Sequence, residues 1–335
     1  MGTTAERFHW GEAGVGHTGQ LETQMGGMPM DRIQLFNRAG KRALAGYVLI
    51  WSISTAYLAI SGGDWMFPIA SLVIFGLIFS AVIWFLTRKM NAPAIPVERP
   101  KHESLGLLAY LAIYAVLLIG IWLGTLREAV PEGPIQELAV LGYKLLIHVG
   151  IPAALIVLLG GALRPLFDSG IRRPGFWPSL FVLSAMMFAL LAVVSPSLQQ
   201  IGALNLATAA VLLWVLGSWA WVSLEAGLCE EFLFRACLQS RLTAWLRSPV
   251  TGIVVTSILF GLAHWPGLFF RGGPGVDGWS TDPIQVAAFT VATLSPLSIS
   301  LGLLWARSRS LLLIVLVHGA IDALPNTAEF VRVWG

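Results

Sequence analysis

Residues 67–87 read FPIASLVIFGLIFSAVIWFLT and contain no charged side chain. An α-helix rises 1.5 Å per residue, so about 20 apolar residues are enough to cross the roughly 30 Å hydrocarbon core of a bilayer. A stretch of this length and composition is therefore predicted to form a membrane-spanning helix.

The composition of the whole chain supports the same interpretation. Of its 335 residues, 56% are hydrophobic and only 12% are charged, whereas soluble domains are about 45–50% apolar and 25% charged. We therefore predict an all-α fold, a polytopic membrane helical bundle of about 8–10 transmembrane helices. Further apolar runs lie at 43–61, 105–125, 140–159, 179–194, 204–224, 250–264, 284–306 and 311–324.

Four regions follow from this pattern. Residues 1–42 contain no apolar run and are predicted to be a flexible cytosolic tail. Residues 43–174 are expected to form N-terminal transmembrane helices, and residues 175–325 a core in which ionisable residues enter the apolar runs. Residues 326–335 are expected to be a C-terminal tail.

The basic residues indicate orientation and not nucleic-acid binding. The net charge is +3, but Lys and Arg occur in short clusters between apolar runs, without a basic stripe that contains exposed aromatic residues. These clusters fall at alternate ends of the predicted helices. We therefore expect an integral protein of a bacterial cytoplasmic membrane with its N-terminus in the cytoplasm, and the lipid bilayer but no nucleic acid as a partner.

The segment 204–247 is too long for one crossing. Its 44 residues would extend about 66 Å as a single helix, roughly twice the hydrocarbon thickness. We expect a break at 223–227, followed by a second helix over 228–246 that enters the membrane from the cytoplasmic side.

Charged residues in membrane segments are costly and usually functional or paired, and several gather at 225–235, EAGLCEEFLFR. Glu231 and Arg235 are four residues apart, so they share a helix face and can form an ion pair. Glu230 points about 100° away and lacks this partner. Glu230 is therefore the better candidate for a general base and Glu231 the better structural residue.

Two later helices carry histidines. His318 and Asp322 have the same four-residue spacing, which allows the carboxylate to orient the imidazole. His264 shares a helix face with Phe260, and we expect Pro266 to end that helix. A single membrane histidine, such as His148, is more often an interhelical hydrogen-bond donor. The joint set is best explained by side chains that face one polar cavity.

These residues resemble the CAAX-protease and bacteriocin-processing family, also called the abortive-infection peptidase-like family. Its motifs EExxxR, FxxxH and HxxxN/D occur in order as Glu230-Glu231-x-x-x-Arg235, Phe260-x-x-x-His264 and His318-x-x-x-Asp322. The resemblance implies an intramembrane endopeptidase with an all-helical fold and a cavity open to the cytosol. It implies a peptide or membrane-protein substrate and requires no cofactor or metal.

The resemblance also implies roles for the motif residues. Glu230 and His264 would activate water, and His318 with Asp322 would bind the carbonyl oxygen. Asp322 stands where eukaryotic members have Asn, and a carboxylate donates a hydrogen bond only when protonated, so we expect it to orient His318. The supporting residues would be Glu231, Arg235 and Phe260.

Other chemistries use similar side chains. Glu, His, His and Asp are suitable zinc ligands, although no HExxH motif is present. Cys229 beside Glu230 is a possible nucleophile, but apolar and acidic neighbours disfavour a thiolate. A proton-coupled transporter or a non-catalytic scaffold is a further alternative.

Overall fold

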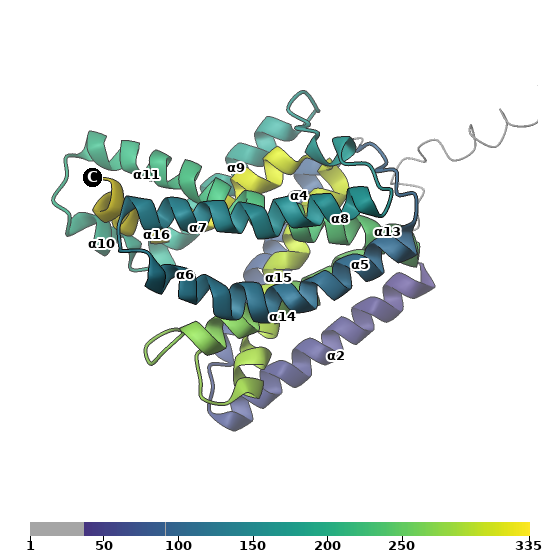
Figure 1. The fold of residues 1–335 in the computed structure, drawn as a ribbon, viewed down its shortest axis with the longest axis horizontal. Coiled ribbons are helices and arrows are strands. Elements are labelled where there is room, and N and C mark those ends of the chain that lie inside the picture. The colour runs from purple at the N-terminus through teal and green to yellow at the C-terminus, as the bar shows by residue number, and fades with distance from the viewer. Residues whose placement is uncertain (1–36, 91) are drawn as a thin grey trace, which may run out of the picture.

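The computed structural model describes residues 37–90 and 92–335 (Figure 1). Within them, nine helices are long and apolar enough to cross a membrane, which confirms the predicted all-α polytopic bundle. The first helix begins at Arg38, so the last residues assigned to the tail are helical. Residues 1–36 of the predicted tail lie outside the described residues.

Four of the nine spans consist of several consecutive helical segments, in which α-helix alternates with wider π-helical turns, and the other five are single α-helices. The segments of the nine spans are α2 (Arg38–Ser61); α3 (Met66–Ser71), η1 (Leu72–Phe79) and α4 (Ser80–Thr87); α5 (Pro100–Ile113), η2 (Tyr114–Trp122) and α6 (Leu123–Ala129); α7 (Pro134–Leu145), η3 (Leu146–Gly150) and α8 (Ile151–Leu158); α9 (Phe176–Val194); α11 (Thr208–Val222), η5 (Ser223–Leu228), α12 (Cys229–Glu231), η6 (Phe232–Gln239) and α13 (Ser240–Leu246); α14 (Pro249–Arg271); α15 (Pro283–Ser308); and α16 (Leu311–Trp334). Two short helices, η4 (Arg164–Phe167) and α10 (Ser197–Gly202), lie between spans.

Local sequence fixes the starts of the last three spans. Ser248, Asp282 and Ser310 precede α14, α15 and α16, and each side chain accepts a hydrogen bond from a backbone N–H in the first turn. Proline occupies an early helical position in α14 and α15, where its fixed φ suits the helix and its missing N–H costs nothing.

The predicted break at 223–227 is wrong. The chain is helical from Thr208 to Leu246, 39 residues in all, and the segment where the break was expected is the π-helical η5. A π turn keeps the backbone N–H and C=O groups bonded within the helix, whereas a break in lipid would leave them unsatisfied. As a result α11 and α13 lie at opposite ends of the molecule (Figure 1).

Proline also fails to end two other helices where we expected an end. α14 continues through Pro266 to Arg271, beyond His264. α16 continues through Pro325 to Trp334, so the predicted C-terminal tail forms the last turns of a helix. Neighbouring helices and side chains compensate for the lost backbone hydrogen bond, which makes proline tolerable inside membrane helices.

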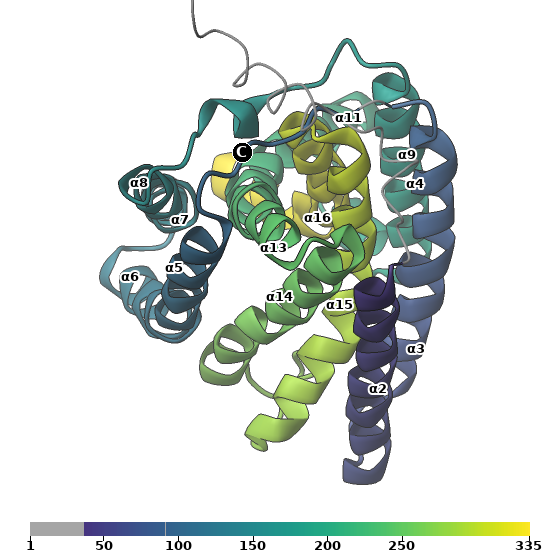
Figure 2. The same cartoon turned by 90° about the vertical axis from the view of Figure 1, so that its right-hand side faces the viewer.

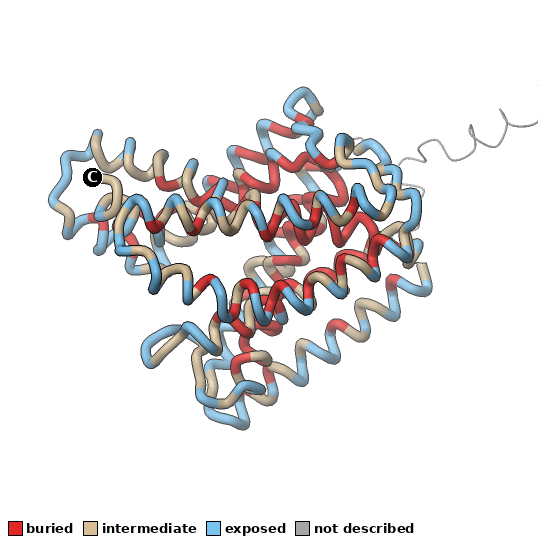
Figure 3. The backbone as a smooth tube through the Cα atoms, in the orientation of Figure 1, coloured by how far each residue is buried: buried red, intermediate tan, exposed pale blue. Residues whose placement is uncertain are grey.

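The last spans form the centre of the bundle, and the first spans lie at its edge. The apolar window of α15 is 72% buried, against 17% for α2, and the tube view shows the same contrast (Figure 3). α14 lies beside α15 in both ribbon views (Figure 2). Their backbones approach closely because Gly261 has no side chain: a Cβ there would lie 2.9 Å from the Thr290 carbonyl oxygen.

The nine spans alternate in direction, so their ends form two opposite faces. At one face the Asn37 side chain donates to the Arg247 carbonyl oxygen at 3.3 Å, and at the other the Tyr57 hydroxyl donates to Asp282 at 2.7 Å. We call the first the basic face, because its segments 38–42, 88–101, 161–175, 247–248 and 307–310 carry thirteen Lys and Arg residues. The segments of the opposite face, 61–65, 127–137, 195–207, 271–282 and 329–335, carry three.

Candidate active site

Glu230 lies between two imidazoles from two other helices. Its Oε1 is 3.8 Å from His264 Nε2, and its Oε2 is 3.8 Å from His318 Nε2. Glu230 belongs to α12, His264 to α14 and His318 to α16. These separations are longer than a direct hydrogen bond, so both rings lie beside the carboxylate without bonding it directly. The three motifs therefore meet around one carboxylate.

A backbone contact fixes the orientation of His264. Its Nδ1 is 2.7 Å from the Phe260 carbonyl oxygen, which can only accept a hydrogen bond, so Nδ1 carries the proton. Nε2 is then the nitrogen that faces Glu230. The Phe260 ring lies 4.6 Å from the His264 ring and 4.5 Å below the Arg235 guanidinium. Phe260 thus separates the cation from the imidazole, and its backbone sets the tautomer.

Glu231 links the first and third motifs. Its Oε1 is 2.6 Å from His318 Nδ1 and 3.2 Å from Arg235 Nη1, so the ion pair predicted from the four-residue spacing is present. Arg235 also donates to the Ser298 hydroxyl on α15 at 3.1 Å. The Glu231 carboxylate therefore accepts a hydrogen bond from His318 Nδ1–H, and this contact directs Nε2 toward Glu230.

Asp322 contacts His318, as its four-residue spacing predicted, but it is not the carboxylate closest to the ring. Its Oδ2 is 3.5 Å from His318 Nε2, which is beyond a strong hydrogen bond and on the nitrogen that faces Glu230. The shorter contact to the ring comes from Glu231, 87 residues away in sequence. Glu231, and not Asp322, therefore holds the His318 ring.

Exposure divides the motif residues into two groups. The side chains of Glu231 and Arg235 are 0% exposed, whereas those of His264 and Asp322 are 34% and 35% exposed. Glu230 is intermediate at 15%. Glu230, His264 and Asp322 are therefore partly accessible, whereas the Glu231–Arg235 pair is enclosed by protein.

A cavity of about 340 Å³ lies beside this cluster. Glu230 and His264 line it, together with Tyr114, Lys144 and His148. The other motif residues do not line it, so His318 lies behind Glu230 as seen from the cavity. The volume falls within the roughly 300–1,000 Å³ typical of small ligand sites.

Sequence reasoning missed two polar contacts of this cavity. His148 accepts a hydrogen bond from the Tyr114 hydroxyl of another span at 2.6 Å, and its Nδ1 donates to the Lys144 carbonyl oxygen of its own helix at 2.8 Å. It is therefore the acceptor of the interhelical contact and not the donor that we expected, and its position beside Glu230 was not foreseen. Lys144 pairs with Glu225 at 2.6 Å. Lys144 and His148 are four residues apart in an apolar run, which is the signal that could have identified them.

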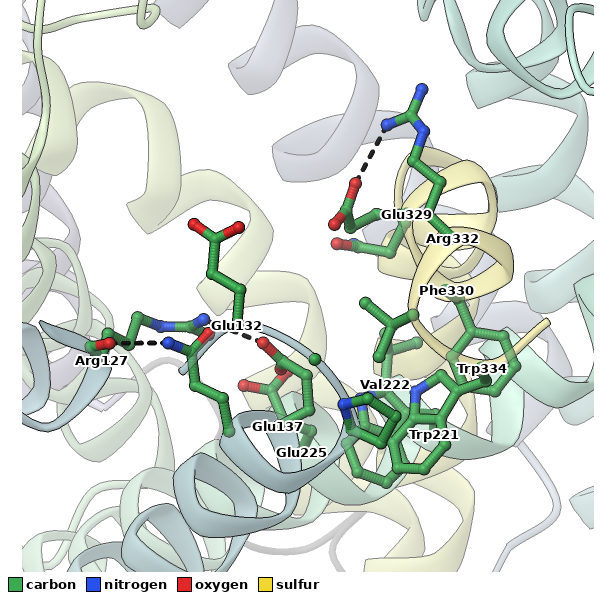
Figure 4. Close-up of a pocket in the computed structure, with 15 residues that line it drawn as sticks. Arg127, Glu132, Glu137, Trp221, Val222, Glu225, Glu329, Phe330, Arg332 and Trp334 are labelled. Carbon is green, nitrogen blue, oxygen red and sulfur yellow. Dashed lines mark hydrogen bonds and ion pairs between the residues drawn. The ribbon is translucent and has the colours of Figure 1, made fainter. Parts of the chain in front are cut away.

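Glu225 lines a second and larger cavity, of about 600 Å³. Figure 4 shows its wall, which combines the acidic Glu132 and Glu137 with an aromatic group of Trp221, Phe330 and Trp334. The Lys144–Glu225 pair thus joins a residue of the smaller cavity to a residue of the larger one.

The described residues give no support to a cysteine nucleophile or to a metal site. Cys229 is fully buried, and its thiol donates to the Leu224 carbonyl oxygen at 3.5 Å, a contact that leaves no role for it as a surface nucleophile. In the part of the chain that the structure describes, no three His, Cys, Asp or Glu side chains are grouped so that they could hold a metal ion.

Comparison with known proteins identifies one family. Residues 212–324 match the family model described as type II CAAX prenyl endopeptidase Rce1-like, which confirms the resemblance inferred from the three motifs. The matched segment runs from α11 to α16 and includes every candidate catalytic residue. No curated protein and no solved structure matched the chain.

Proposed function

We propose that this protein is an intramembrane endopeptidase that hydrolyses a peptide bond of a membrane-associated protein or peptide with a water activated by Glu230 and His264. The observation that carries the proposal is the position of Glu230, whose two oxygens each face a histidine from another helix at 3.8 Å. The match of residues 212–324 to an endopeptidase family supports it.

In the proposed reaction Glu230 is the general base. A water held between Glu230 Oε1 and His264 Nε2 gives a proton to the carboxylate as its oxygen attacks the scissile carbonyl carbon. The resulting tetrahedral intermediate carries a negative oxygen. When it collapses, the C–N bond breaks and the proton passes from Glu230 to the leaving amine.

His318 is the proposed donor to the negative oxygen. Because Nδ1–H donates to Glu231, His318 can donate from Nε2 only as the doubly protonated imidazolium. The carboxylates of Glu230 and Asp322, 3.8 and 3.5 Å from Nε2, stabilise that cation, and its Nε2–H would then donate to the negative oxygen. A fixed donor in a water-poor site is worth about 10²–10³ in rate.

Peptide cleavage by purified protein tests the proposal. We expect Glu230→Gln and His264→Ala each to lower kcat/KM by about 10²–10⁴, the usual contribution of a general acid or base. Glu329→Gln is the matched control. It makes the same change on α16, but Glu329 is exposed and pairs with Arg332 at 3.0 Å at the surface, so cleavage is expected to stay at the wild-type rate.

The other outcomes separate the alternatives. Cleavage retained in the Glu230→Gln variant would remove the peptidase proposal. If the Glu230→Gln and His264→Ala variants lose cleavage only because they no longer fold, as shown by thermal unfolding of the same samples, a scaffold is favoured. Inhibition by a chelator with recovery on added zinc would favour the metal alternative over direct activation by Glu230.

A further inference from the structure

The larger cavity is separate from the proposed active site. Its volume is about 600 Å³, and it shares no lining residue with the cavity beside Glu230. Its walls come from the connection between α6 and α7, from the junction of α11 with η5, and from the last turns of α16. The first and last of these segments lie at the opposite face, so the cavity reaches the level of the lipid headgroups.

The cavity lining carries more negative than positive charge. Four carboxylates line it, against two guanidinium groups. Three of the carboxylates have a cationic partner at 2.9, 3.0 and 2.6 Å, in the pairs Glu137–Arg127, Glu329–Arg332 and Glu225–Lys144. The fourth, Glu132, is exposed and forms no ion pair with any residue that the structure describes. The cavity therefore offers a carboxylate to an added cation.

The aromatic group provides a second element of recognition for a cation. The ring centroids of Trp221 and Trp334 are 5.0 Å apart, and Phe330 lies 6.3 and 6.2 Å from them. Aromatic ring faces attract cations. Elsewhere four arginines lie over an aromatic ring at 4.2–5.6 Å, but within residues 37–90 and 92–335 no Lys or Arg lies over these three rings. Their faces are therefore left to a ligand.

The two kinds of wall define the ligand. Figure 4 shows Glu132 and Glu137 across the cavity from Trp221 and Trp334. We infer that this cavity binds an organic ammonium cation, in which a charged nitrogen is attached to an apolar body. The charge meets the carboxylate, and the apolar substituents meet the ring faces, as in aromatic sites for quaternary ammonium groups. The inference does not rest on the proposed function.

Two sources supply this chemistry. One is a phospholipid with an ammonium headgroup, because the cavity reaches the headgroup level. The other is a soluble organic cation. Both present the same charged group to Glu132 and the aromatic group, so the test measures recognition of the group first and its source second.

Choline chloride is the probe for the group. It is titrated by calorimetry into purified full-length protein in an uncharged detergent. The comparison ligand is 3,3-dimethyl-1-butanol, which has the shape of choline with carbon in place of the charged nitrogen, and sodium chloride controls for ionic strength. We expect choline to bind saturably, the uncharged analogue to bind about tenfold more weakly or less, and sodium chloride to show no binding.

Matched variants locate the site. We expect Trp334→Leu to weaken choline binding by about 3- to 30-fold and Glu132→Gln by about two- to fivefold, while Trp334→Phe retains most of the affinity. The controls are Trp65→Leu and Glu128→Gln, which change exposed residues near the opposite face that do not line the cavity. Both should bind choline as the wild type does. Thermal unfolding without ligand checks that each variant is folded.

Three results would overturn the inference: no saturable binding of choline, equal binding of the uncharged analogue, or wild-type affinity in both Glu132→Gln and Trp334→Leu. The source follows from the same titration in nanodiscs. Weaker choline binding in phosphatidylcholine than in phosphatidylglycerol would support the site and identify the lipid headgroup as its ligand. Equal binding in both would support a site for a soluble cation. None of these measurements involves peptide cleavage, so failure of the peptidase proposal would leave them unchanged.

Discussion

Arg235 holds a positive charge at a point where no water reaches it. Its side chain and that of Glu231 are 0% exposed, and the pair is 3.2 Å apart. Exposed ion pairs contribute about 0–1 kcal/mol to stability. Removing one partner of a buried pair costs about 3–5 kcal/mol, because the remaining charge is left in an apolar setting.

Replacing Arg235 therefore tests whether the pair is structural. We expect Arg235→Ala to lower the midpoint of thermal unfolding in detergent, by an amount corresponding to about 3–5 kcal/mol. The control is Arg332→Ala, because the Arg332–Glu329 pair has side chains 60% and 64% exposed and should contribute at most about 1 kcal/mol. Equal midpoints for the two variants would contradict the structural role.

A double variant refines the same test. Replacing Glu231 and Arg235 together by leucine removes both charges, and a buried pair replaced by apolar residues usually regains stability. We expect the unfolding midpoint to recover while peptide cleavage stays low, because His318 loses the carboxylate to which its Nδ1–H donates. Recovery of both properties would show that Glu231 does not position His318.

Sequence spacing predicts contacts at this scale only when they are local. The Glu231–Arg235 pair follows from four-residue spacing and is present. The contact between Glu231 and His318 joins helices 87 residues apart, and it depends on how α12 and α16 pack. For that reason we expected Asp322, the nearest acidic residue on the same helix, to orient the His318 ring.

Among the elements, the contact between η5 and α16 controls the site. Gly227 in η5 packs against α16 so closely that a Cβ at that position would lie 2.6 Å from the Val315 carbonyl oxygen. Val315 precedes His318 by less than one turn. The spacing of these two helices therefore sets the distance between Glu230 and His318.

A single methyl group should change this spacing. Alanine is a better helix former than glycine by about 1 kcal/mol, but in Gly227→Ala the methyl group meets backbone that has no room to move. We expect a net destabilisation of about 1–3 kcal/mol and reduced cleavage, measured by thermal unfolding and by kcat/KM. In Gly142→Ala the new methyl group meets nothing within 4 Å, so this control should be neutral or stabilised. Similar behaviour of the two variants would exclude the close contact as the cause.

The sequence predicts helices better than it predicts where they end. Apolar runs identified all nine spans because lipid requires about 20 apolar residues per crossing. The rules for breaks and prolines come from helices in water, where backbone groups freed by a break can bond to solvent. In lipid they cannot, so helix continues through η5, Pro266 and Pro325.

For the molecule as a whole, the alternation of basic clusters was predictable, and the cavities were not. The basic segments lie on one face because nine spans alternate in direction, as the sequence pattern indicated. The cavity combines residues of α14 and α15 with Lys144 and His148 from a span outside the family motifs. No local pattern reveals that these spans are neighbours.

The 39-residue span has a consequence for the choice of lipid. A helix of about 58 Å fits a hydrocarbon core of roughly 30 Å only when steeply tilted, and its tilt must respond to hydrophobic mismatch. Glu230 lies on this span, whereas His264 and His318 lie on shorter ones. We therefore expect the rate of cleavage in proteoliposomes to pass through a maximum as the lipid acyl chains lengthen from about 14 to about 22 carbons. The lipid headgroup is kept the same throughout, and the thermal unfolding midpoint is measured to check that stability does not change. A flat profile would show that packing alone fixes the tilt; a maximum would make membrane thickness a regulator of the enzyme.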